Sequence, residues 1–267
     1  DYSSIKEEFP DLIYCSISGF GQTGPKSHRL GYDFMIQAMG GIMSVTGEPD
    51  GSPMKVGVGI ADVMCGMYAA VSILAAVRHR NQSGNSAAGG NGQHIDLSLL
   101  DSQAAWLINS GLNYLTSGDN QQRLGNAHPN LVPYQVFQTS DSFFVLTVGN
   151  EIQFRKFCEF AGAPELPEDP RFKTNTDRVK NRKILAPMLN ELTQRNSTQF
   201  WLEGLEKLQV PCGPVNTIQD VFDDSQIQHR EMEISMSHPL SGNGEVSLIG
   251  SPIKLSTTPV SYRHAPP

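Results

Sequence analysis

The chain has 267 residues, of which 39% are hydrophobic and 18% charged, values typical of a globular protein that buries a substantial core. Its formal net charge of -7 argues against a nucleic-acid partner, because neutralising phosphates requires clustered Lys and Arg. The longest apolar stretch ends at Arg78, His79 and Arg80, short of the roughly 20 residues that cross a bilayer, so we expect no membrane partner.

The first predicted elements lie in residues 11–41. Residues 11–25 alternate apolar side chains and then become rich in glycine, which predicts a short buried strand followed by a turn. Ligands bind beyond such strand ends in open α/β sheets. Residues 32–41 have helical periodicity and end at Gly40 and Gly41, which suit a left-handed helix terminus.

A second helix is predicted from Asp62 to Arg80, where small residues alternate with Met, Val, Ile and Leu. This pattern predicts burial on most sides. Residues 81–92 have the composition of a flexible surface loop, to which we assign no chemistry. Residues 93–115 predict a strand followed by one helix, which completes the alternation typical of an α/β layer.

The character of the sequence changes after Gly118. Residues 132–150 predict a β-hairpin, residues 151–224 are mostly helical in pattern, and residues 234–249 suggest short strands. We therefore expect three parts: part of a large α/β domain over 1–118, a smaller α+β domain over 119–228, and a return segment toward the large domain over 229–267.

Two features of the sequence bear on compartment and metals. The chain starts without Met in what looks like the middle of a domain, so we expect a fragment whose targeting segment, if any, lies upstream. The four cysteines are widely separated and predict neither a zinc site nor a disulfide framework, and a reducing compartment follows as the default: Cys15, Cys65, Cys158 and Cys212. No metal site is expected.

Asp62 is the residue of greatest chemical interest. It stands between a glycine-rich approach and the predicted helix, where an Asp side chain commonly caps the first free N–H groups at about 1 kcal/mol. The positive end of the helix dipole also favours the ionised, nucleophilic carboxylate. Gly57, Gly59 and Ala61 leave space beside it, which a cap alone does not require, although small residues also permit close helix packing.

Five segments of the sequence, in order along nearly the whole chain, resemble the class III (CaiB/BaiF-type) coenzyme A transferases. They are "CSISGFGQTGP", "LGYDFMIQAMGGIMSVTGEPDGSP", "VGIADVMCGMYAA", "GNAHPNLVPYQVFQTSD" and "RFKTNTDRVKNR". The resemblance implies a Rossmann-like large domain interrupted by a smaller α+β domain, with two chains interlocked as a homodimer. Among the family's types, "VPYQVFQT" is most similar to the mitochondrial succinyl-CoA:glutarate CoA-transferases.

The resemblance also implies a role for Asp62. In the family, the aspartate at this position is the covalent nucleophile and carries acyl-anhydride and aspartyl-CoA intermediates. Such chemistry keeps the thioester energy without ATP. The implied substrates are an acyl-CoA donor such as succinyl-CoA and a carboxylic acid acceptor such as glutarate, with no permanently bound cofactor. A fragment that lacks the N-terminal nucleotide-binding portion is expected to be inactive alone.

Two alternative functions stay open. Acyl-CoA racemases of the same superfamily pair such an aspartate with the His of a "GHD" motif, but this chain has Tyr32 between Gly31 and Asp33. Because a phenol is a weak base at neutral pH, racemase activity is disfavoured. The other alternative is a noncatalytic CoA-binding homologue, against which Asp62 and its glycines argue.

Further site residues follow from the resemblance. Tyr32 taken by itself is more often a packed aromatic than a ligand contact. By resemblance, however, its segment corresponds to one that touches CoA: Arg29, Leu30, Gly31, Tyr32 and Asp33. The resemblance also implies that one loop approaches the active site, and it supplies weaker candidates for substrate contact: Gly125, Asn126 and His128. The alternative for His128 is a structural role, in which its ring bonds a backbone group of the turn.

Two charged segments are given structural interpretations first. The basic run over 171–183 predicts a solvated helix face, with binding of CoA phosphates as the alternative. Residues 220–230 predict a capped surface helix and turn without a metal site. By resemblance we expect a mitochondrial protein, or otherwise a cytoplasmic one.

Overall fold

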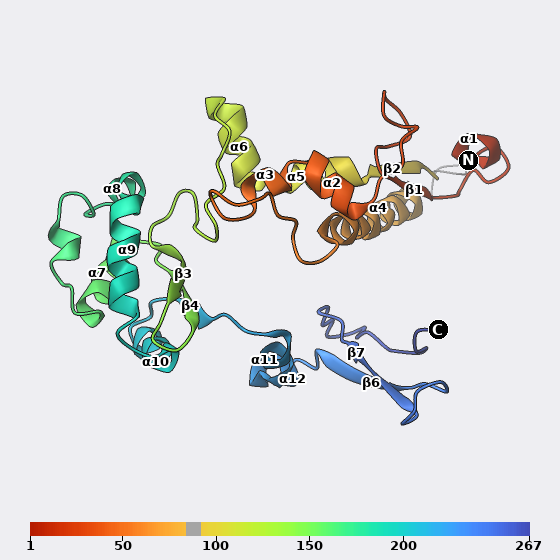
Figure 1. Ribbon diagram of the computed structural model, residues 1–267. Coiled ribbons are helices and arrows are strands. Elements are labelled where there is room, and N and C mark those ends of the chain that lie inside the picture. The colour runs from red at the N-terminus through yellow and green to blue at the C-terminus, as the bar shows by residue number, and fades with distance from the viewer. Residues whose placement is uncertain (84–91) are drawn as a thin grey trace. The chain divides into compact units, whose positions relative to one another are not determined.

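The computed structural model describes residues 1–83 and 92–267 and divides into two compact units, 1–130 and 131–267. Most of the loop expected over 81–92 lies outside the described residues. The predicted domain limits at 118 and 228 stay predictions. Each unit is described by itself below (Figure 1).

The first unit is built on a parallel pair of strands, β1 (Tyr14–Ser18) and β2 (His94–Ser98), whose register runs from Tyr14 opposite His94 to Ser18 opposite Ser98. Parallel neighbours require a long crossover connection, and helices supply it here. The helices of this unit are α1 (Tyr2–Ile5), α2 (Asp33–Met39), α3 (Ile42–Val45), α4 (Ile60–Ser83), α5 (Leu99–Ala105) and α6 (Ile108–Ser117). The expected strand and helix alternation is thus present.

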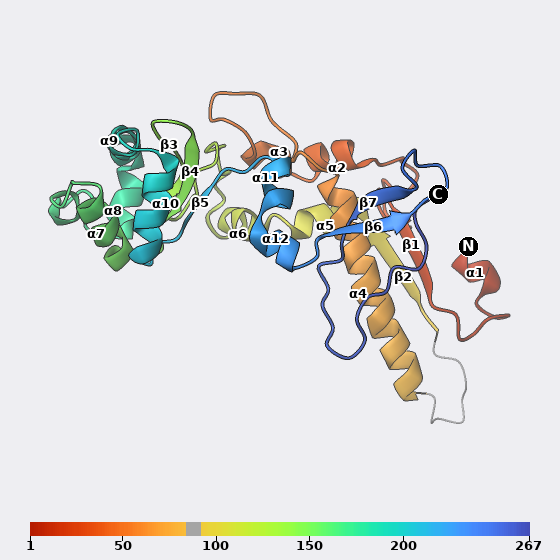
Figure 2. The same ribbon diagram turned by 90° about the horizontal axis from the view of Figure 1, so that it is seen from below.

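The longest helix, α4, buries only one narrow face. It packs against α2, α5, β1 and β2 (Figure 2) through small buried residues at helical spacing: Ala61, Cys65, Ala69 and Ala76. Val71 and Leu74 on its other faces are 62% and 69% exposed. The expectation of burial on most sides is therefore wrong for this chain, because no described element covers those faces.

The same helix bears on the membrane expectation. Among the described residues, α4 is the one helix with the length and hydropathy of a membrane span, over Ile60–Gln82 with mean hydropathy 1.9 and 22% of that window buried. This finding contradicts the expectation that no stretch reaches such a length. Length and hydropathy alone do not separate a bilayer-crossing helix from one covered by protein, so the expected lack of a membrane partner stays a prediction.

The segment after β2 forms two helices where the sequence predicts one. Helix α5 begins at the N-cap Ser98, whose side chain accepts a hydrogen bond from the Asp101 N–H at 2.9 Å. It ends at Ala105, with Trp106 as its C-cap. Ile108 has a positive φ of 44°, which a β-branched residue rarely adopts. The periodicity of the side chains continues across this break, so periodicity alone did not reveal it.

The second unit contains the predicted hairpin within a three-stranded antiparallel sheet of order β3-β4-β5. Its elements are β3 (Tyr134–Gln138), β4 (Phe143–Thr147), α7 (Glu151–Phe160), η1 (Leu166–Glu168), α8 (Asn175–Lys180), α9 (Arg182–Thr193), α10 (Thr198–Lys207), β5 (Cys212–Pro214), α11 (Ile218–Asp223), α12 (Ser225–His229), β6 (Glu233–Ser237) and β7 (Glu245–Ile249). The short strands expected in the tail are present as β6 and β7, which pair antiparallel. Helices α11 and α12 bury no residues, as expected for 220–230.

The core of the second unit is organised around Trp201. Its ring lies 6.1 Å from those of Phe144 and Phe157, and its indole N–H donates a 2.8 Å hydrogen bond to the Thr193 carbonyl. Such a buried indole contributes apolar area only where its N–H finds a partner. The sheet and the helices α7, α9 and α10 therefore share one core.

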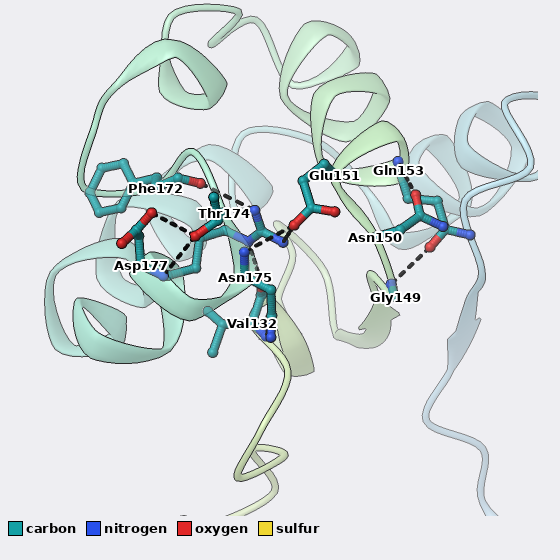
Figure 3. Close-up of polar contacts among 10 residues, drawn as sticks. Val132, Gly149, Asn150, Glu151, Gln153, Phe172, Thr174, Asn175 and Asp177 are labelled. Carbon is teal, nitrogen blue, oxygen red and sulfur yellow. Dashed lines mark hydrogen bonds and ion pairs between the residues drawn. The ribbon is translucent and has the colours of Figure 1, made fainter.

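Arg178 of α8 is fully buried in this unit. Its Nε donates a 2.6 Å hydrogen bond to the Val132 carbonyl, its Nη1 donates to the Phe172 carbonyl at 3.2 Å, and its guanidinium lies 4.4 Å from the centre of the Phe154 ring. Figure 3 shows the polar contacts around Val132, whose N–H also donates to the Asn175 side chain. The solvated face expected over 171–183 is wrong for Arg178, because its side chain is fully buried and bonds the Val132 carbonyl, 46 residues away, as well as the nearby Phe172 carbonyl.

Replacing Arg178 by Met leaves two buried carbonyls without their donors, at about 1–3 kcal/mol each. We expect Arg178→Met to lower the free energy of unfolding by about 3 kcal/mol, measured by chemical denaturation. Arg155→Met, which removes an exposed ion pair with Glu168, is the matched control and should leave the denaturation midpoint unchanged. Equal effects of the two substitutions would contradict this account of Arg178.

Candidate active site

Asp62 occupies the third position of α4, which begins at Ile60. Its side chain is exposed, and within residues 1–83 and 92–267 its carboxylate makes no hydrogen bond or ion pair. The unpaired N–H groups at a helix start carry partial positive charge. The site therefore presents a carboxylate beside this positive end, open to an approaching group.

A different residue caps α4. Asp33, the first residue of α2, accepts a 2.8 Å hydrogen bond at Oδ1 from the backbone N–H of Ala61. The interpretation of Asp62 as the cap of α4 is therefore wrong in this structure, because Asp33 accepts the hydrogen bond from the Ala61 N–H at the helix start. This leaves the Asp62 carboxylate without a structural task.

Gln37, one turn after Asp33 on α2, fixes the cap and the approach to α4. This fully buried side chain donates from Nε2 to Asp33 Oδ2 at 2.8 Å and to the Val58 carbonyl at 3.3 Å. Its Oε1 accepts a hydrogen bond from the Val56 N–H at 2.9 Å. The Gln37 amide thus connects α2 to Val56 and Val58, in the segment that leads into α4.

Gly59 lies beside both carboxylates. A Cβ atom at this position would stand 3.8 Å from Asp33 Oδ1 and 3.8 Å from Asp62 Oδ2. A Cβ at Gly57 would meet no atom within 4 Å. The approach is therefore open at Gly57, whereas a side chain at Gly59 would contact both carboxylates.

A mostly apolar cavity of about 220 Å³ borders the first turn of α4. Its wall includes Val56, Ile60, Met64 and Trp106. Gln103 also lines it, and the Oε1 atom of this buried side chain has no hydrogen-bond partner among the described residues. The cavity gives the site an apolar neighbour large enough for a few methylene groups.

The segment before α2 runs past this site with its side chains outward. Leu30 is 82% exposed and Tyr32 76% exposed, so the packed-aromatic interpretation of Tyr32 does not hold in this structure. The Arg29 guanidinium lies 5.3 Å from the centre of the Phe20 ring. Contact of this segment with CoA stays a prediction.

Gly31 in the same segment touches Gly19, just after β1. A Cβ on Gly31 would lie 2.5 Å from the Gly19 Cα, and a Cβ on Gly19 would lie 2.6 Å from the Gly31 Cα. Neither backbone can accommodate a side chain here. Gly31 therefore has a packing role of its own.

The loop with the weaker candidates is tied to residues 47–48. The Gly125 N–H donates a 3.0 Å hydrogen bond to the Gly47 carbonyl, and Gly125 has a φ of 61°. His128 Nδ1 accepts a hydrogen bond from the Asn130 N–H at 3.1 Å, which is a turn contact of the kind expected for a structural histidine. The substrate roles of Gly125, Asn126 and His128 stay predictions.

Sequence reasoning missed the two buried glutamines, Gln37 and Gln103. A signal existed for Gln37, because it follows Asp33 by four residues and such pairs face one another on a helix. No pattern distinguished Gln103. Within the part of the chain that the structure describes, no group of three or more His, Cys, Asp or Glu side chains is placed to hold a metal ion.

The model of CoA-transferase family III matches residues 1–267. The succinate–glutarate CoA-transferase of Agrobacterium fabrum is 42% identical over 267 residues, which are 100% of this chain and 65% of that protein. The succinyl-CoA:glutarate CoA-transferase of Mus musculus is 39% identical over 266 residues, which are 100% of this chain and 59% of that protein. The chain thus spans less than two thirds of these relatives' lengths.

Two further similarities widen the picture. The acetyl-CoA:oxalate CoA-transferase of Acetobacter aceti is 37% identical over 257 residues, which are 96% of this chain and 63% of that protein. The crystal structure of a CaiB/BaiF family protein from Brucella suis superposes with a TM-score of 0.79 at 45% identity, covering 98% of this chain and 66% of that one. The expected α/β fold is confirmed by this match, whereas an interlocked dimer is not tested by a single chain.

The different bonding of the two carboxylates is testable by chemical modification. In the folded protein we expect a water-soluble carbodiimide and an amine to modify Asp62, because its oxygens are exposed and free, and to spare Asp33, both of whose oxygens accept hydrogen bonds. Peptide mass mapping reads out both sites. Unfolding in urea should make Asp33 react as well, and equal modification of the two in the folded state would contradict the geometry.

Proposed function

The chain belongs to CoA-transferase family III, and we propose that the full-length protein transfers coenzyme A from an acyl-CoA donor to a carboxylic acid through covalent intermediates on Asp62. The observation that carries the proposal is the free, exposed carboxylate of Asp62 at the start of a helix that Asp33 caps. A carboxylate with no structural partner in such a place is available as a nucleophile.

The first half of the proposed reaction converts the donor. An Asp62 oxygen attacks the thioester carbonyl carbon, the C–S bond breaks, and CoA leaves as a thiolate, so that a mixed anhydride links the donor acyl group to Asp62. The thiolate then attacks the Asp62 carbonyl carbon of this anhydride. The donor acid leaves as a carboxylate, and Asp62 now carries CoA as a thioester.

The second half runs these steps in the opposite direction with the acceptor. The acceptor carboxylate attacks the Asp62 thioester carbon and expels the CoA thiolate, which forms a second mixed anhydride. The thiolate then attacks the acceptor's acyl carbon, and the Asp62 carboxylate leaves. Each step exchanges one acyl bond for another, so no oxidant, reductant or nucleotide is consumed.

The start of α4 supports these steps electrostatically. Negative charge develops on the carbonyl oxygen at each attack, and nearby backbone N–H groups stabilise it. The Ala61 N–H already bonds Asp33 and the Ile60 N–H bonds the Val58 carbonyl at 2.9 Å. Among the described residues the Asp62 N–H has no partner, so we assign it to the developing oxyanion.

The substrates and assembly belong to the same proposal. The two relatives named for glutarate are 42% and 39% identical to this chain, and the one named for oxalate is 37% identical. These similarities support succinyl-CoA as donor and glutarate or a similar dicarboxylate as acceptor. The exposed apolar faces of α4 support burial against further protein in a homodimer. A mitochondrial location rests on the resemblance alone.

The racemase and the noncatalytic homologue are the competing functions. Tyr32, where racemases have His, supports neither proton abstraction nor return at the α carbon. Exchange of the substrate α proton with solvent would favour the racemase. Binding of CoA thioesters without acyl exchange would favour the noncatalytic protein.

Covalent trapping tests the role of Asp62. The full-length protein incubated with succinyl-CoA should yield an Asp62 hydroxamate after hydroxylamine treatment, detected by peptide mass spectrometry. Asp62→Asn should abolish both the adduct and turnover, because a neutral amide is a poor nucleophile. Asp101→Asn is the matched control, since Asp101 is also the third residue of its helix. Normal transfer by Asp62→Asn would refute the proposal.

The acceptor is tested by a panel of acids with succinyl-CoA as donor. We expect kcat/KM for glutarate to exceed that for oxalate by about tenfold or more, because the longer acid places methylene groups against an apolar wall. A coupled assay of CoA ester formation measures each rate. Preference for oxalate would contradict the assignment to the glutarate type while leaving transfer chemistry intact.

A further inference from the structure

The hydrogen bonds between α2 and the start of α4 form a closed set around two side chains. Asp33 accepts from Ala61 N and from Gln37 Nε2, both at 2.8 Å. Gln37 accepts from Val56 N at 2.9 Å and donates to the Val58 carbonyl at 3.3 Å. We call these two side chains the Asp33–Gln37 clamp.

We propose that the Asp33–Gln37 clamp positions the Asp62 nucleophile. This proposal rests on the function proposed above. Asp33 acts through Ala61, the residue next to Asp62, and each of its two oxygens is engaged in a hydrogen bond within the protein, unlike those of Asp62. The clamp fixes the first turn of α4 and the segment before it as one body. It thereby fixes the direction of the free carboxylate.

The clamp contributes to rate through orientation. A nucleophile displaced by about 1 Å from its attack geometry loses about 10²-fold in rate. The first turn of a helix is its weakest part, because the first four N–H groups have no partner within the helix. Val56 N and Val58 O are held by a side chain that is itself fully buried, so the approach segment has little freedom to shift.

This role differs from the CoA contact that the resemblance implies for Asp33. The side chains that face outward in this segment are those of Leu30 and Tyr32, whereas the Asp33 oxygens point toward α4 and Gln37. A CoA-binding residue affects KM for the acyl-CoA. A positioning residue affects kcat and leaves KM unchanged.

The substitution Asp33→Asn keeps the shape of the side chain but removes its charge and replaces one acceptor oxygen by an N–H₂ donor. The asparagine Oδ1 still accepts from Ala61 N, but its amide N–H₂ then faces the Gln37 N–H₂. Turning the Gln37 amide over does not relieve this conflict, because its N–H₂ would then face the Val56 N–H. We expect kcat in the full-length protein to fall about tenfold or more, with KM for succinyl-CoA within twofold of wild type.

The double substitution Asp33→Asn/Gln37→Glu provides the rescue. The asparagine N–H₂ donates to one oxygen of the carboxylate introduced at position 37, and the other oxygen of that carboxylate accepts from Val56 N. The bond to Val58 O is lost and an oxygen faces that carbonyl in its place, so the rescue is expected to be partial. We expect kcat to recover at least half of its loss on a logarithmic scale. Gln37→Glu alone places two carboxylates together and should be slower than the double variant.

Hydrogen exchange provides a readout that does not depend on the reaction. Mass spectrometry of the peptide over residues 56–64 should show faster amide exchange in Asp33→Asn than in wild type, and protection should return in the double variant. Unchanged exchange in Asp33→Asn, no recovery in the double variant, or a raised KM with unchanged kcat would each overturn the proposal. Failure to trap an Asp62 adduct in wild type would instead overturn the proposed function, and the exchange result would still decide whether the clamp holds α4.

Discussion

One hydrogen bond, from the Ala61 N–H to Asp33 Oδ1, allows Asp62 to be both well placed and chemically free. Helix starts need an acceptor, and an acid at this position ordinarily serves its own helix. Here the acceptor comes from α2, 28 residues earlier in the chain. Because that need is met from outside, the Asp62 carboxylate makes no hydrogen bond among the described residues, while it remains in the positive field of the helix start.

The fold brings these two acids together through a parallel strand pair. Strands β1 and β2 lie side by side, and the helices between them must cross over the pair, which packs α2 and α4 against each other. The close contact of Gly19 with Gly31 directs the chain from the end of β1 into α2. The site thus stands beyond the end of a strand, where α/β sheets bind ligands.

The sequence allowed β1, β2, α2, α4 and the hairpin of the second unit to be predicted, since each has a local pattern. Asp62 was singled out for the same reason. The cap by Asp33 and the burial of Arg178 were not predictable, because each depends on a backbone group many residues away, the Ala61 N–H for Asp33 and the Val132 carbonyl for Arg178. The exposure of α4 was misjudged since a small-residue stripe indicates close packing on one face and says nothing of the others.

The contact between Gly19 and Gly31 has a consequence for motion. Because a Cβ on either glycine would lie 2.6 Å or less from the other's Cα, the end of β1 and the segment before α2 pack backbone against backbone, with no side chain between them. A contact without intervening side chains has few ways to shift, so the end of β1, Asp33 and the first turn of α4 are expected to move as one body. Conformational change near Asp62 is therefore expected first in outward-facing side chains such as Leu30 and Tyr32, which are 82% and 76% exposed.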